Sequence, residues 1–149
     1  VIIGDLEEIY MKDKKIDNKR LLLRPFPQGI QNEETRKNLW TQYRKDMISQ
    51  AGISLFLFGN KKDEDGKIIL ANGMEEEYQI SKQNKNIIIP IGITGYSTKE
   101  IYNELEKEGL EHYGEKKEKI IDLFQKLNTG ALNEELIENI LKFLKIMTN

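Results

Sequence analysis

Two basic residues stand where they could bind a phosphate. Lys61 directly follows Gly59-Asn60 at the expected end of a strand, where a flexible ammonium and backbone N–H groups can meet the same anion. Arg44 lies on the flank of an apolar helical stripe, so its stem can pack while its planar guanidinium forks onto a phosphate. Spacing alone favours plainer interpretations, which are an exposed loop lysine and an arginine on a solvated helix face.

Three consecutive glutamates, Glu75, Glu76 and Glu77, follow Gly73 in the first turn of an expected helix. A carboxylate at this position can accept both hydrogens of a vicinal diol, which is how nucleotide sites recognise a ribose. The helix dipole also stabilises acids in a first turn without any ligand. Ribose recognition and ordinary helix chemistry therefore both stay open.

Other groups of residues give weaker evidence for a functional site. Asp63-Glu64-Asp65-Gly66 resembles the start of a calcium loop, but the ligand spacing and the closing glutamate are missing. His112 has no partner at metal-ligand spacing, and the serines lack the partners of a catalytic triad. We therefore predict no catalytic residue, no metal site and no cofactor.

The elements that would position these residues alternate between strands and helices. Helical spacing of apolar residues predicts helices over 1–12, over 33–50, after Gly73, around 120–127 and around 136–144. Nearly continuous apolar runs predict strands over 20–24, 53–58 and 86–91. Strand 53–58 should be central and covered on both faces. The pattern predicts a single Rossmann-like α/β domain over residues 1–149, a parallel sheet flanked by helices with a helical C-terminal tail.

Further local patterns predict how individual helices pack. Helix 33–50 carries an apolar stripe of Leu39, Trp40, Tyr43 and Met47, and the last helix carries one of Leu136, Ile137, Ile140, Leu141 and Leu144. Ser97-Thr98-Lys99-Glu100 has the spacing of a capping box, which predicts that another helix begins there.

Ligands of an open parallel sheet gather at the carboxyl ends of its strands, where loops and helix N-termini present unpaired backbone donors. That rule selects loops 24–29, 59–61 and 92–95, together with the start of the helix after Gly73. Besides Arg44, Lys61 and Glu76, it provides six weaker candidates, which are Gln28, Gly59, Asn60, Asn72, Gly73 and Glu77.

The amino-acid composition argues against several classes of binding partner. The 23 basic and 25 acidic residues give a formal net charge of -2, so no long-range field favours nucleic acid or an anionic membrane. The absence of cysteine excludes a disulfide framework and fits a cytoplasmic protein. No apolar run approaches the roughly 20 residues that span a bilayer. The chain opens at Val1 inside an apolar pattern, so we expect a fragment of a longer protein.

The sequence resembles the SLOG-type nucleotide-sensor domains of Thoeris anti-phage effectors. Four segments in order carry the resemblance, Leu23-Arg24-Pro25-Phe26-Pro27-Gln28, Tyr43-Arg44-Lys45-Asp46, Leu57-Phe58-Gly59-Asn60-Lys61 and Asn72-Gly73-Met74-Glu75-Glu76-Glu77-Tyr78. Each motif is short, but their order and spacing together are specific. The resemblance extends through essentially the whole chain.

The resemblance implies a role in sensing. In that family, a sirtuin-like domain degrades NAD, and the SLOG domain binds a cyclic ADP-ribose isomer that a partner TIR-domain protein makes after infection. This chain would be the sensor half of a homo-oligomer, tetrameric in the full-length protein, and not an enzyme in its own right. The family's phosphate- and ribose-contacting residues fall on Arg44, Lys61 and Glu76, and Glu77 could replace Glu76 in that role.

The sequence departs from the family in two places. SLOG domains begin with a strand, a helix, a second strand and a glycine-rich phosphate loop that should end just before Val1, and we expect that loop to be missing here. The helix start of related LOG phosphoribohydrolases is matched only in part by Gly73-Met74-Glu75-Glu76-Glu77, because the threonine is replaced. Hydrolysis is therefore disfavoured.

These observations lead to one hypothesis and two rivals. Arg44 and Lys61 would bind the pyrophosphate of the cyclic ligand and Glu76 a ribose, and binding would allosterically activate an attached NAD-degrading domain. One rival is a LOG-like nucleoside or nucleotide N-glycosidase with Glu76 or Glu77 as nucleophile or base beside Asn72. The other is an oligomerisation domain whose tail helices, around 136–144, make subunit contacts.

Overall fold

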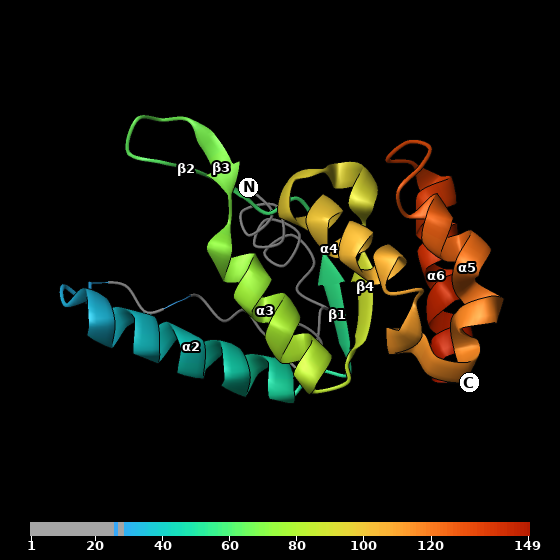
Figure 1. The fold of residues 1–149 in the computed structure, drawn as a ribbon, viewed down its shortest axis with the longest axis horizontal. Coiled ribbons are helices and arrows are strands. Elements are labelled where there is room, and N and C mark those ends of the chain that lie inside the picture. The colour runs from blue at the N-terminus through green and yellow to red at the C-terminus, as the bar shows by residue number, and fades with distance from the viewer. Residues whose placement is uncertain (1–25, 27–28) are drawn as a thin grey trace, which may run out of the picture.

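A computed structural model describes residue 26 and residues 29–149 (Figure 1). In chain order its elements are α2 (Glu33–Ser49), β1 (Ile53–Phe56), β2 (Asn60–Lys62), β3 (Ile68–Leu70), α3 (Asn72–Gln83), β4 (Ile87–Pro90), the 3-10 helix η1 (Gly92–Thr94), α4 (Tyr96–Lys107), the 3-10 helix η2 (Glu111–Lys116), α5 (Lys117–Lys126) and α6 (Glu134–Thr148). The helix predicted over 1–12 and the strand predicted over 20–24 lie outside the described residues.

Two parallel strands, β1 and β4, form the sheet that the sequence predicted. They pair in register from Ile53 opposite Ile87 to Phe56 opposite Pro90. Figure 1 shows α2 and α3 on one side of these strands and α5 and α6 on the other. The predicted α/β class, a parallel sheet flanked by helices and followed by a helical C-terminal tail, is confirmed.

The segment between β1 and α3 differs from the loop that the sequence predicted. Strands β2 and β3 pair antiparallel and form a hairpin that projects from the start of α3 (Figure 1). Its turn is closed by Asp63, whose side chain accepts hydrogen bonds from the backbone N–H groups of Asp65 and Lys67. The acidic run that resembled a calcium loop therefore acts as a turn.

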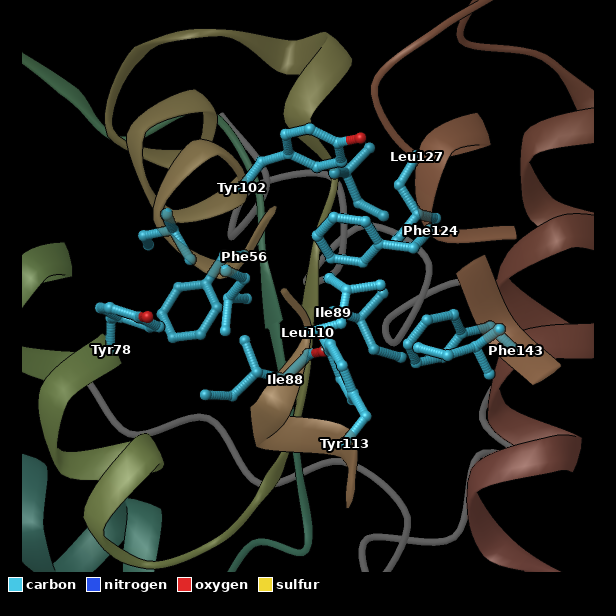
Figure 2. Packing of buried hydrophobic residues seen from close by; sticks show 14 of the residues in the cluster. Phe56, Tyr78, Ile88, Ile89, Tyr102, Leu110, Tyr113, Phe124, Leu127 and Phe143 are labelled. Carbon is cyan, nitrogen blue, oxygen red and sulfur yellow. Dashed lines mark hydrogen bonds between the residues drawn. The ribbon is translucent and has the colours of Figure 1, made fainter. Parts of the chain in front are cut away.

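The hydrophobic core is built around β4 (Figure 2). Ile88 and Ile89 point to opposite faces of this strand, and both are fully buried. On the α4 and α5 side, the rings of Tyr102 and Phe124 stack with their centroids 4.5 Å apart. Tyr113 donates a buried hydrogen bond of 2.9 Å to the carbonyl of Ile88. The strand that is covered on both faces is therefore β4.

The prediction that strand 53–58 is covered on both faces was wrong, whereas its central position stays a prediction, because the strand predicted over 20–24 lies outside the described residues. Within the described residues β1 pairs only with β4, and its residues Ile53 and Leu55 are 42% and 48% exposed. They line an open groove of about 400 Å³ together with Met47 and Met74. An apolar run indicates burial in general, but the packing of α2 and α3 decides which face is covered.

Helix α2 begins where predicted, since the side chain of Asn32 accepts a hydrogen bond of 2.8 Å from the backbone N–H of Thr35. In the predicted stripe, Trp40, Tyr43 and Met47 are half-buried and none is fully buried. Leu39 is 41% exposed, whereas Arg44 and Ile48 are buried. The reason is that α2 packs on α3 through a charged cluster, which draws the arginine inward.

Helix α4 begins at Tyr96 without the predicted capping box. Its N-cap is Gly95, and no side chain caps it. The Ser97 hydroxyl instead donates to the carbonyl of Gly59 at 2.7 Å and accepts from the N–H of Ala71 at 3.2 Å. Tertiary hydrogen bonds to two loops therefore take the place of the local cap.

The two predicted tail helices are confirmed as α5 and α6, but the buried face of α6 differs from the prediction. Leu136, Asn139 and Phe143 face inward, whereas Ile137 and Leu141 are 58% and 60% exposed. The helical spacing of these apolar residues did not show which edge of the stripe is buried and which is exposed.

Candidate ligand-binding site

A cluster of charged side chains with a buried arginine lies where the middle of α2 meets the first turns of α3. The Nη1 of Arg44 lies 2.8 Å from Oε2 of Glu76, and its Nε lies 3.3 Å from Oε1 of Glu77. Thr41, one turn earlier on α2, donates a hydrogen bond to the other oxygen of Glu76. Only 9% of the Arg44 side chain is exposed, so this guanidinium depends on its carboxylate partners. We call Arg44, Glu76 and Glu77 the arginine cluster.

Two neighbours shape the space around the guanidinium. The ring of Phe26 lies 4.8 Å from Cζ of Arg44, which is cation–π geometry. On the α3 side, a Cβ added to Gly73 would lie 2.5 Å from Nη2 of Arg44. Gly73 therefore permits the close approach that the ion pairs require.

The two carboxylates of the arginine cluster oppose a single positive charge. Burial raises the pKa of the Glu77 carboxyl, the Arg44 guanidinium acts against this rise, and the adjacent Glu76 carboxylate adds to it. Two carboxylates thus share one arginine, and the pKa of Glu77 is raised. One of the two can give up its place to an anion, or accept hydrogen bonds from hydroxyl groups.

The loops at the carboxyl ends of β1 and β4 are joined by backbone hydrogen bonds. The N–H of Phe58 donates to the Thr94 hydroxyl at 2.8 Å, and the N–H of Thr98 donates to the carbonyl of Phe58 at 3.0 Å. The N–H of Ala71 donates to the carbonyl of Gly59 at 2.9 Å. The starts of α3 and α4 thus converge at the sheet edge that the strand-end rule selected.

Gly59 connects this edge to the arginine cluster. Its φ of 86° is left-handed, and an added Cβ would lie 2.4 Å from Sδ of Met74 and 2.7 Å from Cβ of Ser97. Met74 follows Gly73, which contacts Arg44. The strand-end loop and the arginine cluster therefore share the first turn of α3 and form one continuous candidate site.

The structure brings together some of the predicted site residues and separates others. Arg44, Glu76 and Glu77 are in contact, and Gly59 and Gly73 lie beside them. Lys61 lies in β2, paired across the hairpin with Ile69, and its exposed side chain is not part of the arginine cluster. Asn60 and Asn72 are also exposed, and Gln28 lies outside the described residues.

Sequence reasoning missed two residues of the site. Thr41 supplies a hydrogen bond to Glu76, and Phe26 packs against the guanidinium. The position of Thr41, three residues before Arg44 on the same helix, is a signal that could have found it. The contact of Phe26 joins segments that are distant in the sequence, and no local pattern indicates it.

Two kinds of feature are absent from the described residues. They contain no group of three or more histidine, cysteine, aspartate or glutamate residues placed to hold a metal ion. In the same part of the chain, no helix has the length and apolar character needed to cross a membrane.

Parallel strands flanked by helices, with polar loops and helix starts at their carboxyl ends, define a Rossmann-like α/β domain. Comparison with known proteins then identifies its family. Residues 1–147 match the Sir2- and TIR-associating SLOG family, STALD, and the chain belongs to that family.

Several relatives support the same assignment, each named NAD(+) hydrolase ThsA. The protein from Bacillus cereus (strain MSX-D12) is 43% identical over 150 residues, which cover 100% of this chain and 30% of that protein. The protein from Acinetobacter baumannii (strain 532279) is 44% identical over 85% of this chain and 27% of its own length. The protein from Enterococcus faecium is 33% identical over 83% of this chain and 24% of its own. The chain thus spans less than a third of each of these relatives.

Proposed function

We propose that this chain is a sensor domain that binds a cyclic ADP-ribose isomer and thereby controls an attached NAD-degrading domain. The observation that carries the proposal is the buried arginine cluster beside the carboxyl ends of the parallel strands. The relatives are named as NAD(+) hydrolases and are more than three times as long as this chain, which is consistent with an attached catalytic part. The signal would come from a TIR-domain protein, and the full-length protein would act as a cytoplasmic homo-oligomer.

The phosphates and the riboses of the ligand would bind to different residues of the site. A phosphate on Arg44 replaces one carboxylate partner with an anion that can bind in bidentate geometry, so the buried guanidinium stays paired. The carboxylate released from Arg44, together with its neighbour, accepts hydrogen bonds from a ribose diol. Lys61, exposed on the hairpin, would supply a second positive charge to the pyrophosphate.

Ligand binding can control a second domain only if the ligand has different affinities for two arrangements of the protein. A ligand shifts such an equilibrium by no more than its differential affinity for the two arrangements. Exchange of carboxylate for phosphate on Arg44 changes the contact between α2 and α3. That contact is therefore the element through which the proposed ligand would act.

The proposal is tested by calorimetric titration with cyclic ADP-ribose isomers, ADP-ribose and NAD. We expect one cyclic isomer to bind most tightly, and Arg44→Ala and Lys61→Ala to weaken its binding. Arg44→Lys keeps a positive charge but loses the fork, so it tests the geometry in a variant that is less prone to unfold. Lys37→Ala is the matched control, because Lys37 is exposed and forms an ion pair with Glu33 on the same helix. Absence of binding to a folded wild-type chain would refute the sensor function.

One observation favours a second candidate, the LOG-like N-glycosidase. The raised pKa of Glu77 is typical of a carboxyl that donates or accepts a proton in catalysis. Chromatography after long incubation with nucleotides distinguishes the two functions. Release of free base that is lost in Glu77→Gln supports the enzyme, whereas recovery of intact nucleotide supports the sensor.

A third candidate, an oligomerisation domain, is favoured by the exposed apolar residues Ile137 and Leu141 on α6. Oligomerisation that needs no ligand, and that survives Arg44→Ala but not Ile137→Lys, would support this function. Light scattering of the two variants measures it directly.

A further inference from the structure

Two aromatic residues at the strand-end loops combine an exposed ring with an unfavourable backbone. Phe58, just after β1, has a φ of 59°, and Tyr96, the first residue of α4, has a φ of 53°. Their side chains are 40% and 42% exposed. A bulky residue in the left-handed region costs on the order of 1–3 kcal/mol, and such strain is concentrated at functional sites.

The two residues lie close together although 38 positions separate them in the sequence. The N–H of Phe58 bonds to the hydroxyl of Thr94, and its carbonyl accepts from the N–H of Thr98, so the peptide of Phe58 lies across the segment that contains Tyr96. Both residues flank the loop of Gly59, which contacts the first turn of α3. The backbones of Phe58 and Tyr96 therefore lie at the same edge of the sheet, beside the loop that contacts the first turn of α3.

Packing does not account for the strain at these two positions. The other left-handed residues of the described chain that are not glycine are Lys85 and Leu110. Leu110 is 5% exposed and belongs to the core, so burial of its side chain offsets its strain. Lys85 ends the turn between α3 and β4, at the opposite end of the sheet. Phe58 and Tyr96 carry the same strain while they stay 40% and 42% exposed, at positions where glycine would have no strain.

We propose that Phe58 and Tyr96 bind the purine base of the nucleotide ligand, as aromatic surfaces on which the base stacks beside the phosphate- and ribose-binding arginine cluster. This inference rests on the proposed function and adds to it the part of the site that recognises the base. Every base has a flat π-face, so exposed aromatic side chains are suited to hold one without hydrogen bonding. Hydrogen bonds to its N–H and its carbonyl hold the backbone of Phe58 in place before the ligand arrives, which reduces the entropy lost on binding.

Phe58→Gly in the 149-residue chain tests the proposal, because it removes the ring and the backbone strain together. Calorimetry with cyclic ADP-ribose and ADP-ribose should show binding weakened by roughly tenfold to a hundredfold, the usual loss for one stacked base. Ribose 5-phosphate has no base, so its affinity should not change. The denaturation midpoint of this variant should be equal to or above that of the wild type, since an exposed ring is lost and strain is relieved.

Two matched variants separate the ring from the backbone. Lys85→Gly relieves the same backbone strain at the far end of the sheet and should leave the affinity for all three probes unchanged. Phe58→Leu keeps the strained backbone and an apolar side chain but has no π-face, so it should weaken nucleotide binding as Phe58→Gly does. Tyr96→Gly should behave like Phe58→Gly, and Tyr96→Phe like the wild type.

The outcomes distinguish this inference from the proposed function. If the wild type binds the nucleotides and both Phe58→Gly and Phe58→Leu bind them equally well, base stacking is refuted while the sensor function stands. An equal loss for ribose 5-phosphate would also refute it, because the residue would then act on the sugar phosphate. If the folded wild type binds none of the three probes, the proposed function fails and this inference fails with it.

Discussion

Gly73→Ala should be destabilising although alanine is the better helix former. Gly73 lies in α3, where replacing glycine by alanine ordinarily stabilises a helix by about 0.5–1 kcal/mol. Here the new Cβ would lie 2.5 Å from Nη2 of Arg44 and 3.4 Å from its Cζ. The guanidinium is buried and paired with Glu76 and Glu77, so it cannot move away without lengthening these contacts. Overpacking of this kind costs about 1–3 kcal/mol, which outweighs the gain in helix propensity.

Urea unfolding measures the effect, and Gly52→Ala is its matched control. Nothing lies within 4 Å of a Cβ added to Gly52, so that change should be neutral or stabilise the fold by about 0.4–1 kcal/mol. In an Arg44→Met background, the penalty of Gly73→Ala should shrink, because the atom that it displaces is gone. If Gly73→Ala is as harmless as Gly52→Ala in the wild type, the close packing of the arginine cluster is refuted.

Three further changes test separate parts of the structure. The pKa of Glu77 is raised in the fold, so the folded chain holds this proton more tightly than the unfolded chain. As pH rises above the ordinary pKa of 4.5, the free energy of unfolding of the wild type should therefore fall relative to that of Glu77→Gln. Urea unfolding at a series of pH values measures this, and the opposite trend would contradict it. Tyr113→Phe leaves the buried carbonyl of Ile88 without its donor and should cost about 1–3 kcal/mol in urea unfolding, whereas a neutral result would mean that this hydrogen bond adds nothing. Ser97→Ala removes a hydroxyl that donates to the carbonyl of Gly59 and accepts from the N–H of Ala71, so it should reduce the free energy of unfolding in urea by about 0.5–1.5 kcal/mol, and an unchanged free energy of unfolding would refute its role.

Local patterns in the sequence were enough to locate most elements of the described fold. Helix α2 starts at its predicted first residue, and the apolar run before Gly92 forms β4 within one residue of its predicted ends at each side. These features depend on interactions between residues a few positions apart, such as a cap or an alternating backbone direction. The same patterns could not indicate the β2–β3 hairpin, because its strands are only three residues long.

The candidate site was predictable in its location and only partly in its composition. The rule for strand ends placed Gly59, Gly73 and Glu76 at one edge, because parallel strands direct their carboxyl ends the same way. It also selected Lys61, which lies in β2 of the hairpin and is not in contact with the arginine cluster in the described residues.

By itself, the sequence determined the α/β class, the family resemblance and the edge of the sheet where charged loops gather. Tertiary structure alone decided that Arg44 is buried between two glutamates, that β4 and not β1 is covered on both faces, and that Phe58 and Tyr96 hold exposed rings on a left-handed backbone. The physical reason is the range of the forces involved. Helix and strand preferences act between near neighbours, whereas burial, ion pairing and backbone strain depend on which distant segments the packed chain brings into contact.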